Sequence, residues 1–245
     1  MDQELCVRLF WLLLAVPLTT PAVGAIVPEG YKLLYEQNFD KPEAIQDFVF
    51  SDAQAWRISQ ENATSSLELF KQSQYAPKHR SPFNIALIAD RVFGDFILEV
   101  ELQSTVKPYN HQDMCLFFGF EATNKFYYTH IAVKPDPIKA ESHAHDIFIV
   151  KDSPRLAIAE KVSAGVTWGE NTWHKVRLER KLAGGTVKVF FDDLTQPIMI
   201  GRDNTFGAGY VGFGSFDDLG KIGHVKIYAT SVHVRKTDFF KRRQK

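Results

Sequence analysis

The stretch MCLFFGFEATNKFYYTHIAV, residues 114–133, decides the fold class of this chain. Two apolar runs, 114–120 and 126–133, flank a short polar turn. The pattern of strand-like runs and polar turns returns at HDIFIVKD (145–152), WHKVRLERKLAGGTVKVFFDD (173–193) and GYVGFGSFDD (209–218). Side chains alternate across a β-strand, so such runs predict antiparallel strands that bury one face. We therefore expect an all-β fold, a two-sheet antiparallel sandwich.

Along the whole chain, the same criterion predicts about fourteen strands and no helix longer than a turn or two. The strands are expected near residues 31–39, 46–50, 55–59, 66–71, 83–89, 93–104, 113–120, 126–133, 146–151, 156–161, 173–181, 186–192, 209–215 and 222–234. The Gly184–Gly185 pair is expected to turn a hairpin with positive φ angles. The residues expected in the core include Phe96, Leu98, Val100, Val211 and Phe213.

Length and charge limit the domain organisation and the partners. With 245 residues and 45% hydrophobic content, the chain can bury one sizeable core. Residues 26–235 are expected to form a single β-sandwich domain, and the basic C-terminal tail, 236–245, is expected to be solvated. Lys plus Arg and Asp plus Glu both number 29, so no net field favours nucleic acid as a partner.

The N-terminal segment has the features of a signal peptide. Its apolar run, LFWLLLAVPL at 9–18, is too short to span a bilayer and is followed by the small residues Val23, Gly24 and Ala25. We expect cleavage after residue 25, a secreted or periplasmic protein, and no stable membrane span afterwards. An uncleaved anchor is the alternative, because the acidic residues before the run outnumber Arg8. Cleavage would remove Cys6 and leave Cys115 as a buried, inert thiol without a disulfide partner.

Residues able to bind a ligand gather around the runs 113–120, 126–133 and 146–151. If these strands are neighbours, the wet face of their sheet offers an aromatic ring for stacking a sugar and imidazoles for its hydroxyl groups. The candidate substrate-binding residues are His111, Asp113, Tyr128, His130, His145 and Arg155. In an enzyme, His130 or His145 would be the general base, and Asp113 would orient the base or bind a metal.

Two metal sites are alternatives for the same region and for the loops. By ligand type, zinc or manganese would suit the set His143, His145, Asp146 and Asp113. A structural Ca²⁺ that ties the first and last strands together would have oxygen ligands in Asp40, Asp217 and Asp218. Loop acids that cap turns explain the second set equally well.

Signatures of common hydrolases are missing from the chain. A glycosidase needs two carboxylates about 5–9 Å apart across the scissile bond. The nearest sequence candidate, Glu99-Val100-Glu101, is explained by strand alternation as an exposed face. The chain also lacks a Gly-x-Ser-x-Gly elbow, a phosphate-binding glycine loop and a His-Glu-x-x-His motif.

The runs AWRIS (55–59), SPFNIALI (81–88), FGDFILEVEL (93–102), HQDMCLFFGF (111–120), FYYTHIAV (126–133), DIFIVKDSPRLAIAEK (146–161), WHKVRLER (173–180), VKVFFDDLTQPIM (187–199) and YVGFGSFDDLG (210–220) carry a resemblance. Together they resemble the secreted concanavalin A-like (laminin G-like) jelly rolls of bacterial polysaccharide-degrading lineages. More loosely, they are similar to the 3-keto-disaccharide hydrolase domain family. The resemblance covers about residues 31–229.

The resemblance implies a two-sheet jelly roll whose concave face binds carbohydrate and carries His111, Asp113, Tyr128, His130 and His145. Two departures matter: no Asn-Ser-Gly run follows FILEVELQST, and His224 stands where related jelly rolls often have an acid that helps to hold calcium. The leading hypothesis is a carbohydrate-recognising protein that binds an oligo- or polysaccharide. The alternatives are a glycoside or keto-glycoside hydrolase or lyase, which leaves enzymatic activity open, and an envelope scaffold protein.

Overall fold

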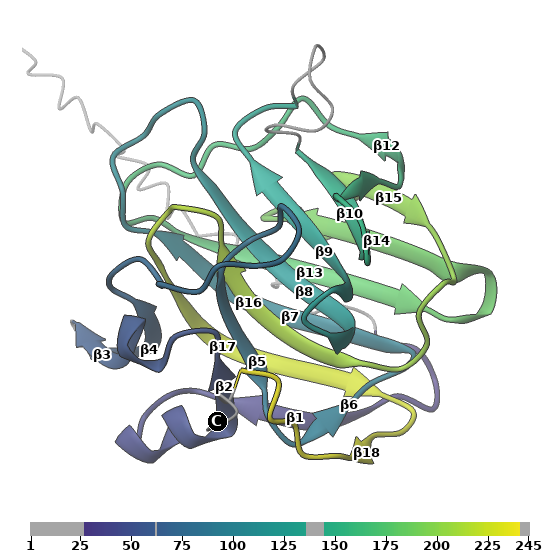
Figure 1. Ribbon diagram of the computed structural model, residues 1–245, viewed down its shortest axis with the longest axis horizontal. Helices are drawn as coiled ribbons and strands as arrows, with labels where there is room; N and C mark the ends of the chain where they lie inside the picture. The colour runs from purple at the N-terminus through teal and green to yellow at the C-terminus, as the bar shows by residue number, and fades with distance from the viewer. Residues whose placement is uncertain (1–26, 62, 136–144, 241–245) are drawn as a thin grey trace, which may run out of the picture.

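The computed structural model describes residues 27–61, 63–135 and 145–240, and nearly all of its strands belong to two antiparallel sheets (Figure 1). Sheet A consists of β1 (Lys32–Gln37), β3 (Trp56–Glu61), β4 (Thr64–Leu69), β7 (Phe96–Ser104), β12 (Ala159–Val162), β13 (Trp173–Lys181), β14 (Thr186–Phe191), β15 (Met199–Arg202) and β17 (Gly220–Ala229). Its order is β12–β15–β14–β13–β7–β17–β4–β3, and β1 pairs with β17.

Sheet B consists of β2 (Phe48–Phe50), β5 (Asn84–Ile88), β8 (Asp113–Ala122), β9 (Lys125–Ala132), β10 (Asp146–Lys151), β11 (Leu156–Ala157) and β16 (Tyr210–Ser215). Its order is β11–β10–β9–β8–β16–β5–β2. A small pair, β6 (Arg91–Val92) and β18 (His233–Val234), lies at the lower edge of Figure 1. Helical structure in the described residues is limited to the 3₁₀ segments η1 (Pro42–Asp47), η2 (Ala53–Ala55) and η3 (Ala183–Gly185). The expected all-β, two-sheet antiparallel architecture is confirmed.

The main core draws apolar side chains from both sheets and therefore fills the space between them. Leu116 and Ile131 enter it from sheet B, and Leu98 enters it from sheet A. The five residues expected in the core, Phe96, Leu98, Val100, Val211 and Phe213, are all at most 3% exposed. The alternation in the sequence therefore identified the inner faces correctly.

The turn between β13 and β14 has the predicted chemistry. Gly184 and Gly185 have φ angles of 79° and 62°, in the region that a side chain disfavours. A Cβ atom on Gly185 would also lie 2.5 Å from the backbone carbonyl of Asp203. Both conformation and space therefore require glycine at residue 185, and the hairpin aligns Leu178 with Val189 across the two strands.

The outer face of sheet B is a second apolar cluster. Cys115, Phe117, Tyr128 and Phe148 lie in it, each 0% exposed, among other side chains of β5, β8, β9, β10 and β16. The expectation of a wet face on these strands is therefore wrong, because apolar side chains from loops and from the C-terminal segment cover it. These covering residues include Tyr75, Phe216, Phe239 and Phe240.

The C-terminal segment also differs from the expectation. Phe239 and Phe240 pack against the outer cluster, with Phe239 5.5 Å from the ring of Phe120 and 5.3 Å from that of Tyr210. The segment up to Phe240 is therefore part of the fold and is not a solvated tail. Residues 1–25 with the expected signal peptide, His143 and residues 241–245 lie outside the described residues.

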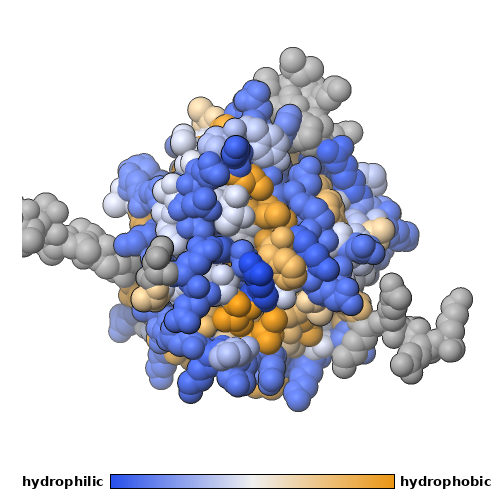
Figure 2. Space-filling model, turned by 90° about the vertical axis from the view of Figure 1, so that its left-hand side faces the viewer, coloured by the Kyte–Doolittle hydropathy of each residue, from blue (hydrophilic) through white to orange (hydrophobic). Residues whose placement is uncertain are grey.

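One face of the molecule is mainly polar. Figure 2 shows one face as mostly hydrophilic, with apolar side chains gathered in a narrow strip. No helix among the described residues is long and apolar enough to cross a membrane.

Candidate functional site

A cluster of ionisable groups lies where β8 begins and β9 ends. Antiparallel pairing puts Cys115 opposite His130 and His130 opposite Asp146 on the next strand. Asp113 is two residues before Cys115, so both side chains leave β8 on the same face. The register of three neighbouring strands therefore brings these groups together at one end of sheet B, as expected from the sequence.

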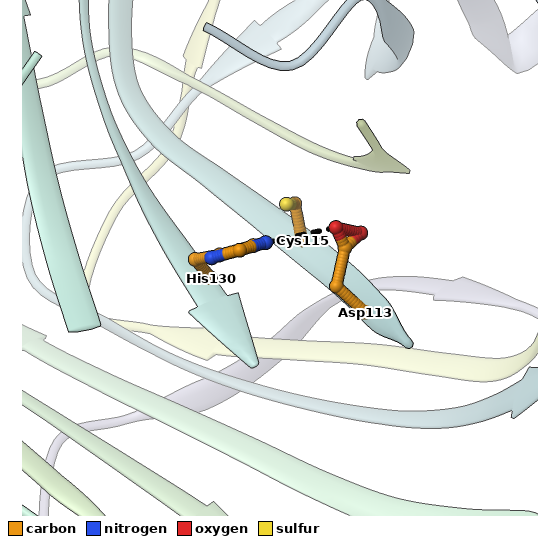
Figure 3. Close-up of side chains that lie close together, drawn as sticks. All are labelled: Asp113, Cys115 and His130. Atoms are coloured by element: carbon orange, nitrogen blue, oxygen red, sulfur yellow. Dashed lines mark hydrogen bonds and ion pairs between the residues drawn. The ribbon is translucent and has the colours of Figure 1, made fainter. Parts of the chain in front are cut away.

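A buried imidazole–carboxylate pair is the centre of the cluster (Figure 3). Nε2 of His130 lies 2.8 Å from Oδ2 of Asp113, and Figure 3 shows the ring pointing at the carboxylate with Cys115 beside both. Asp113 is 1% and His130 4% exposed. The other carboxylate oxygen of Asp113 accepts a hydrogen bond from the backbone N–H of Phe216 at 3.3 Å. The pair is therefore held in place by the pairing of β8 with β9 and by the loop after β16.

Asp218 adds a second buried carboxylate. It is 2% exposed and accepts hydrogen bonds from the backbone N–H of Asp113 and, at 2.7 Å, from the hydroxyl of Tyr109. Burial, and then the negative charge of Asp113, raise the pKa of Asp218 to about 7. Two carboxyl groups taken out of water this close together are unusual in a protein core, where charged groups are paired or serve a function.

Arg155 contacts three aromatic side chains at the same end of the sheet. The guanidinium group of Arg155 lies 4.5 Å from the ring centre of Phe148 and 4.8 Å from that of Phe216. It donates a hydrogen bond of 2.8 Å to the hydroxyl of Tyr128. Tyr128 is 0% and Arg155 5% exposed. The ring of Tyr128 therefore packs inside the protein and presents no open platform for a sugar, contrary to the expectation.

His145 is a buried, neutral imidazole. Its Nδ1 accepts a hydrogen bond of 3.1 Å from the backbone N–H of Ala132, and its Nε2 lies 3.1 Å from the hydroxyl of Ser163. Burial, followed by the charge of His130, lowers the pKa of His145 to about 4. These contacts tie the end of β9 to the loop after β12. In the described structure His145 fixes backbone positions.

The exposed edge of the cluster is the loop between β7 and β8. Tyr109 is 41% exposed, although its hydroxyl donates a hydrogen bond to buried Asp218. His111, also exposed, has its ring centre 6.0 Å from that of Tyr109. Asp217, exposed on the loop after β16, is close enough for its charge to contribute to the raised pKa of Tyr109, of which burial is the largest cause. This edge combines an anchored aromatic ring with polar side chains.

The two metal sites considered from the sequence differ in their geometric support. Within the described residues, the one set of three or more His, Cys, Asp or Glu residues whose ligand atoms all lie within 4.8 Å of one another is Asp113, Cys115 and His130. Asp40 and Asp217 are exposed and Asp218 is buried, and no such set contains them. The calcium alternative therefore has no geometric support in the described structure. His143, from the other alternative, lies outside the described residues.

Sequence reasoning missed several members of the site. The sequence assigns Cys115 to the core alone, although its spacing of two residues from Asp113 places both side chains on one face. Tyr109 carried no local signal, because its importance comes from the contact with Asp218, 109 residues away in the sequence. Phe216 was equally hidden, since it stacks on Arg155 through loop geometry.

A separate groove lies at the other edge of sheet B. It has a volume of about 930 Å³ and runs along β2 and η2, the loop at 71–76 and the C-terminal segment. Its lining combines aromatic rings with polar side chains, among them Asp52, Gln54, Lys71, Gln74, Tyr75 and Phe239. None of the site residues predicted from the sequence lines this groove.

No protein-family model matches the chain, and no curated protein matches it. Several solved structures are similar to the chain. The carbohydrate binding module CBM66 from Bacillus subtilis is similar with a TM-score of 0.51 and 15% identity over 75% of this chain and 96% of the module. A protein of unknown function with a galectin-like fold from Bacillus subtilis is similar with a TM-score of 0.55 and 13% identity over 84% of this chain and all (100%) of that protein.

A third similar structure is the GH43 protein BlXynB from Bacillus licheniformis, with a TM-score of 0.52 and 10% identity over 79% of this chain and 39% of that protein. At such identities the likeness establishes the fold alone. The chain is therefore a jelly-roll sandwich of the concanavalin A-like type, as the resemblance implied. The likeness to the 3-keto-disaccharide hydrolase family stays a prediction.

Proposed function

We propose that this chain is an exported carbohydrate-binding protein and that its sugar site lies where the β7–β8 loop meets the loop after β16. The observation that carries the proposal is Tyr109: the residue is 41% exposed although its hydroxyl donates a hydrogen bond of 2.7 Å to buried Asp218. The export part rests on the signal-like N-terminal sequence. The similarity to a carbohydrate binding module supports the ligand class.

An anchored, exposed ring suits sugar recognition for a physical reason. The apolar face of a pyranose packs on an aromatic ring, and a ring that is already fixed loses little conformational entropy on binding. Hydroxyl groups around the sugar need donors and acceptors at the rim of the stack, and His111 and Asp217 are polar side chains near Tyr109 that can supply them. Tyr109 therefore replaces Tyr128 as the stacking residue, while Asp113 and His130 support the site from behind.

Binding should be measured by calorimetry with a panel of soluble polysaccharides and their oligosaccharides. Tyr109→Ala should weaken the affinity about 5- to 10-fold, since a stacked aromatic contributes about 1 kcal/mol or more beyond its buried area. Tyr109→Phe keeps the ring but loses the bond to Asp218, so a smaller loss is expected. Lys71→Ala, in the separate groove, is the matched control and should bind like the parent.

The results distinguish a sugar site at Tyr109 from one in the groove at β2. Equal affinities of parent and Tyr109→Ala, combined with weaker binding by Lys71→Ala, would move the site to the groove at β2. Absence of binding by the parent across the panel would overturn the proposed function itself. Circular dichroism of each variant ensures that a lost fold is not taken for a lost site.

Catalysis is the second candidate, favoured by the 2.8 Å contact between His130 and Asp113. A general base whose imidazole is oriented by a carboxylate has this geometry. The pair is at most 4% exposed, so a substrate does not reach it in the described structure, and this ranks binding first. Turnover of a glycoside or keto-glycoside by the parent, lost in a folded His130→Gln variant, would reverse the ranking.

A further inference from the structure

The buried group Asp113, Cys115 and His130 combines three different metal-ligating atoms in one place. The carboxylate and the thiol leave the same face of β8 two residues apart, and the imidazole faces the thiol from the paired strand β9. Figure 3 shows the three side chains converging above the two strands. Since all three come from paired strands, the group is held by backbone hydrogen bonds and needs no loop to assemble it.

We propose that Asp113, Cys115 and His130 bind one divalent transition metal ion of the zinc type. A thiolate, an imidazole and a carboxylate are the ligands that Zn²⁺ takes in proteins, and thiolate sulfur disfavours Ca²⁺ and Mg²⁺. On binding, the metal replaces the proton of the Cys115 thiol, which leaves to solvent. Three protein ligands leave the fourth tetrahedral position open.

Small side-chain shifts bring the distances into the range of such an ion. In a tetrahedral site with bonds of about 2.0–2.3 Å, ligand atoms lie roughly 3.3–3.7 Å apart. The ligand atoms here all lie within 4.8 Å of one another, and the closest pair, His130 Nε2 and Asp113 Oδ2, is 2.8 Å apart. That pair has to separate by roughly half an ångström to admit the metal, a shift that side-chain rotation supplies.

Two further observations point to a cation at this place. The Cys115 thiol is 0% exposed and makes no hydrogen bond within the described part of the chain, so it is available as a ligand. Asp113 and Asp218 bring two carboxyl groups together in the protein interior, where a divalent cation offsets their repulsion. Asp218 accepts hydrogen bonds from the backbone N–H of Asp113 and from the hydroxyl of Tyr109. It therefore orients the metal ligand Asp113 without being a ligand itself.

The full chain should be stripped with EDTA, loaded with Zn²⁺ or Co²⁺, freed of excess metal and measured for metal content. We expect about one equivalent of Zn²⁺ per chain, and for Co²⁺ the intense near-ultraviolet band of a thiolate–cobalt bond. Cys115→Ser and Cys115→Ala should both lose the band and bind Zn²⁺ at least 10-fold more weakly, since a ligand has been removed. Either variant suffices if the other does not fold.

A matched control exists in the second imidazole–carboxylate pair of the fold. His174 and Asp192 also lie 2.8 Å apart, but they belong to no such ligand group within the described residues. Asp192→Asn removes the carboxylate of that pair, and the left-handed backbone of residue 192, with φ of 57°, suits asparagine. This variant should keep the full metal content. Substoichiometric Zn²⁺ in the parent, or a cobalt–thiolate band that survives in the Cys115 variants, would overturn the inference.

The metal measurement needs no glycan, so it stands apart from the proposed sugar site. A protein that binds one Zn²⁺ but no polysaccharide supports the metal site and contradicts the proposed function. A protein that binds polysaccharide equally well after EDTA treatment and holds no Zn²⁺ gives the opposite result.

Discussion

Burial of a single histidine links the stability of this fold to pH. The ring of His145 is 0% exposed, and burial lowers its pKa from 6.5 to about 4. Below pH 6.5 the unfolded chain takes up a proton at this residue that the folded chain refuses until about pH 4. The unfolded state then binds more protons, so the free energy of unfolding decreases as the pH falls through this window.

Urea unfolding between pH 7 and pH 4.5 measures the effect. A shift of this size corresponds to roughly 3 kcal/mol when integrated over the whole window, and most of it should be visible by pH 4.5. His145→Asn, which cannot take up the proton, should show a clearly shallower pH dependence. His233→Asn is the control, because that residue is exposed and should follow the parent. Parallel curves for the parent and His145→Asn would contradict the assigned burial.

At the scale of secondary structure, the C-terminal segment completes the fold. Phe239 and Phe240 cover the rings of Phe120 and Tyr210 on the outer face of sheet B and pack against Tyr75 of a covering loop. Replacing both phenylalanines by alanine should lower the free energy of unfolding by about 2–4 kcal/mol, because two half-buried aromatic side chains lose their contacts. Val234→Ala, on the same segment but 83% exposed, should change it by less than about 0.5 kcal/mol.

Chemical denaturation of the three proteins decides this prediction. A double variant as stable as the parent would show that the segment is only loosely attached. Binding of a hydrophobic dye should also increase in the double variant, since the outer cluster of sheet B would become accessible.

The outer face of sheet B, which this segment covers, is a part of the fold that the sequence pattern did not predict. Period-two alternation located most strands of both sheets, and it identified inner-face residues such as Leu98 and Phe213. Strands buried on both faces have no such contrast: Phe117 and Phe118 are neighbours in β8, and both are 0% exposed. Strand β15 was missed because its sequence, Met199–Arg202, does not alternate.

The candidate site shows the same limit. Strand spacing brought Asp113 and His130 together correctly, because register follows from local pattern. Whether those side chains face water depends on the loops that carry Phe216 and Tyr109. It also depends on the C-terminal segment, which is more than a hundred residues away in sequence. Loop conformation is set by such distant contacts, so burial at the site could not be predicted from strand patterns.

For the whole molecule, the continuity of the main core predicts one cooperative unfolding transition. Trp56 on β3, at the edge of sheet A, and Trp168, before β13, belong to the same cluster of buried side chains. If residues 26–235 form a single domain, the packed environments of Trp56 and Trp168 should be lost together.

Far-ultraviolet circular dichroism and tryptophan fluorescence should then give coincident urea transitions in the parent, in Trp56→Phe and in Trp168→Phe. Trp11 and Trp173 are present in all three proteins, so the two variants differ only in whether Trp56 or Trp168 contributes to the fluorescence. A difference in midpoint between the fluorescence and dichroism curves of either variant would indicate separately folding parts. Coincident curves would mean that the buried Asp113–His130 pair shares the stability of the entire sandwich, because the strands that hold it cannot open without the core.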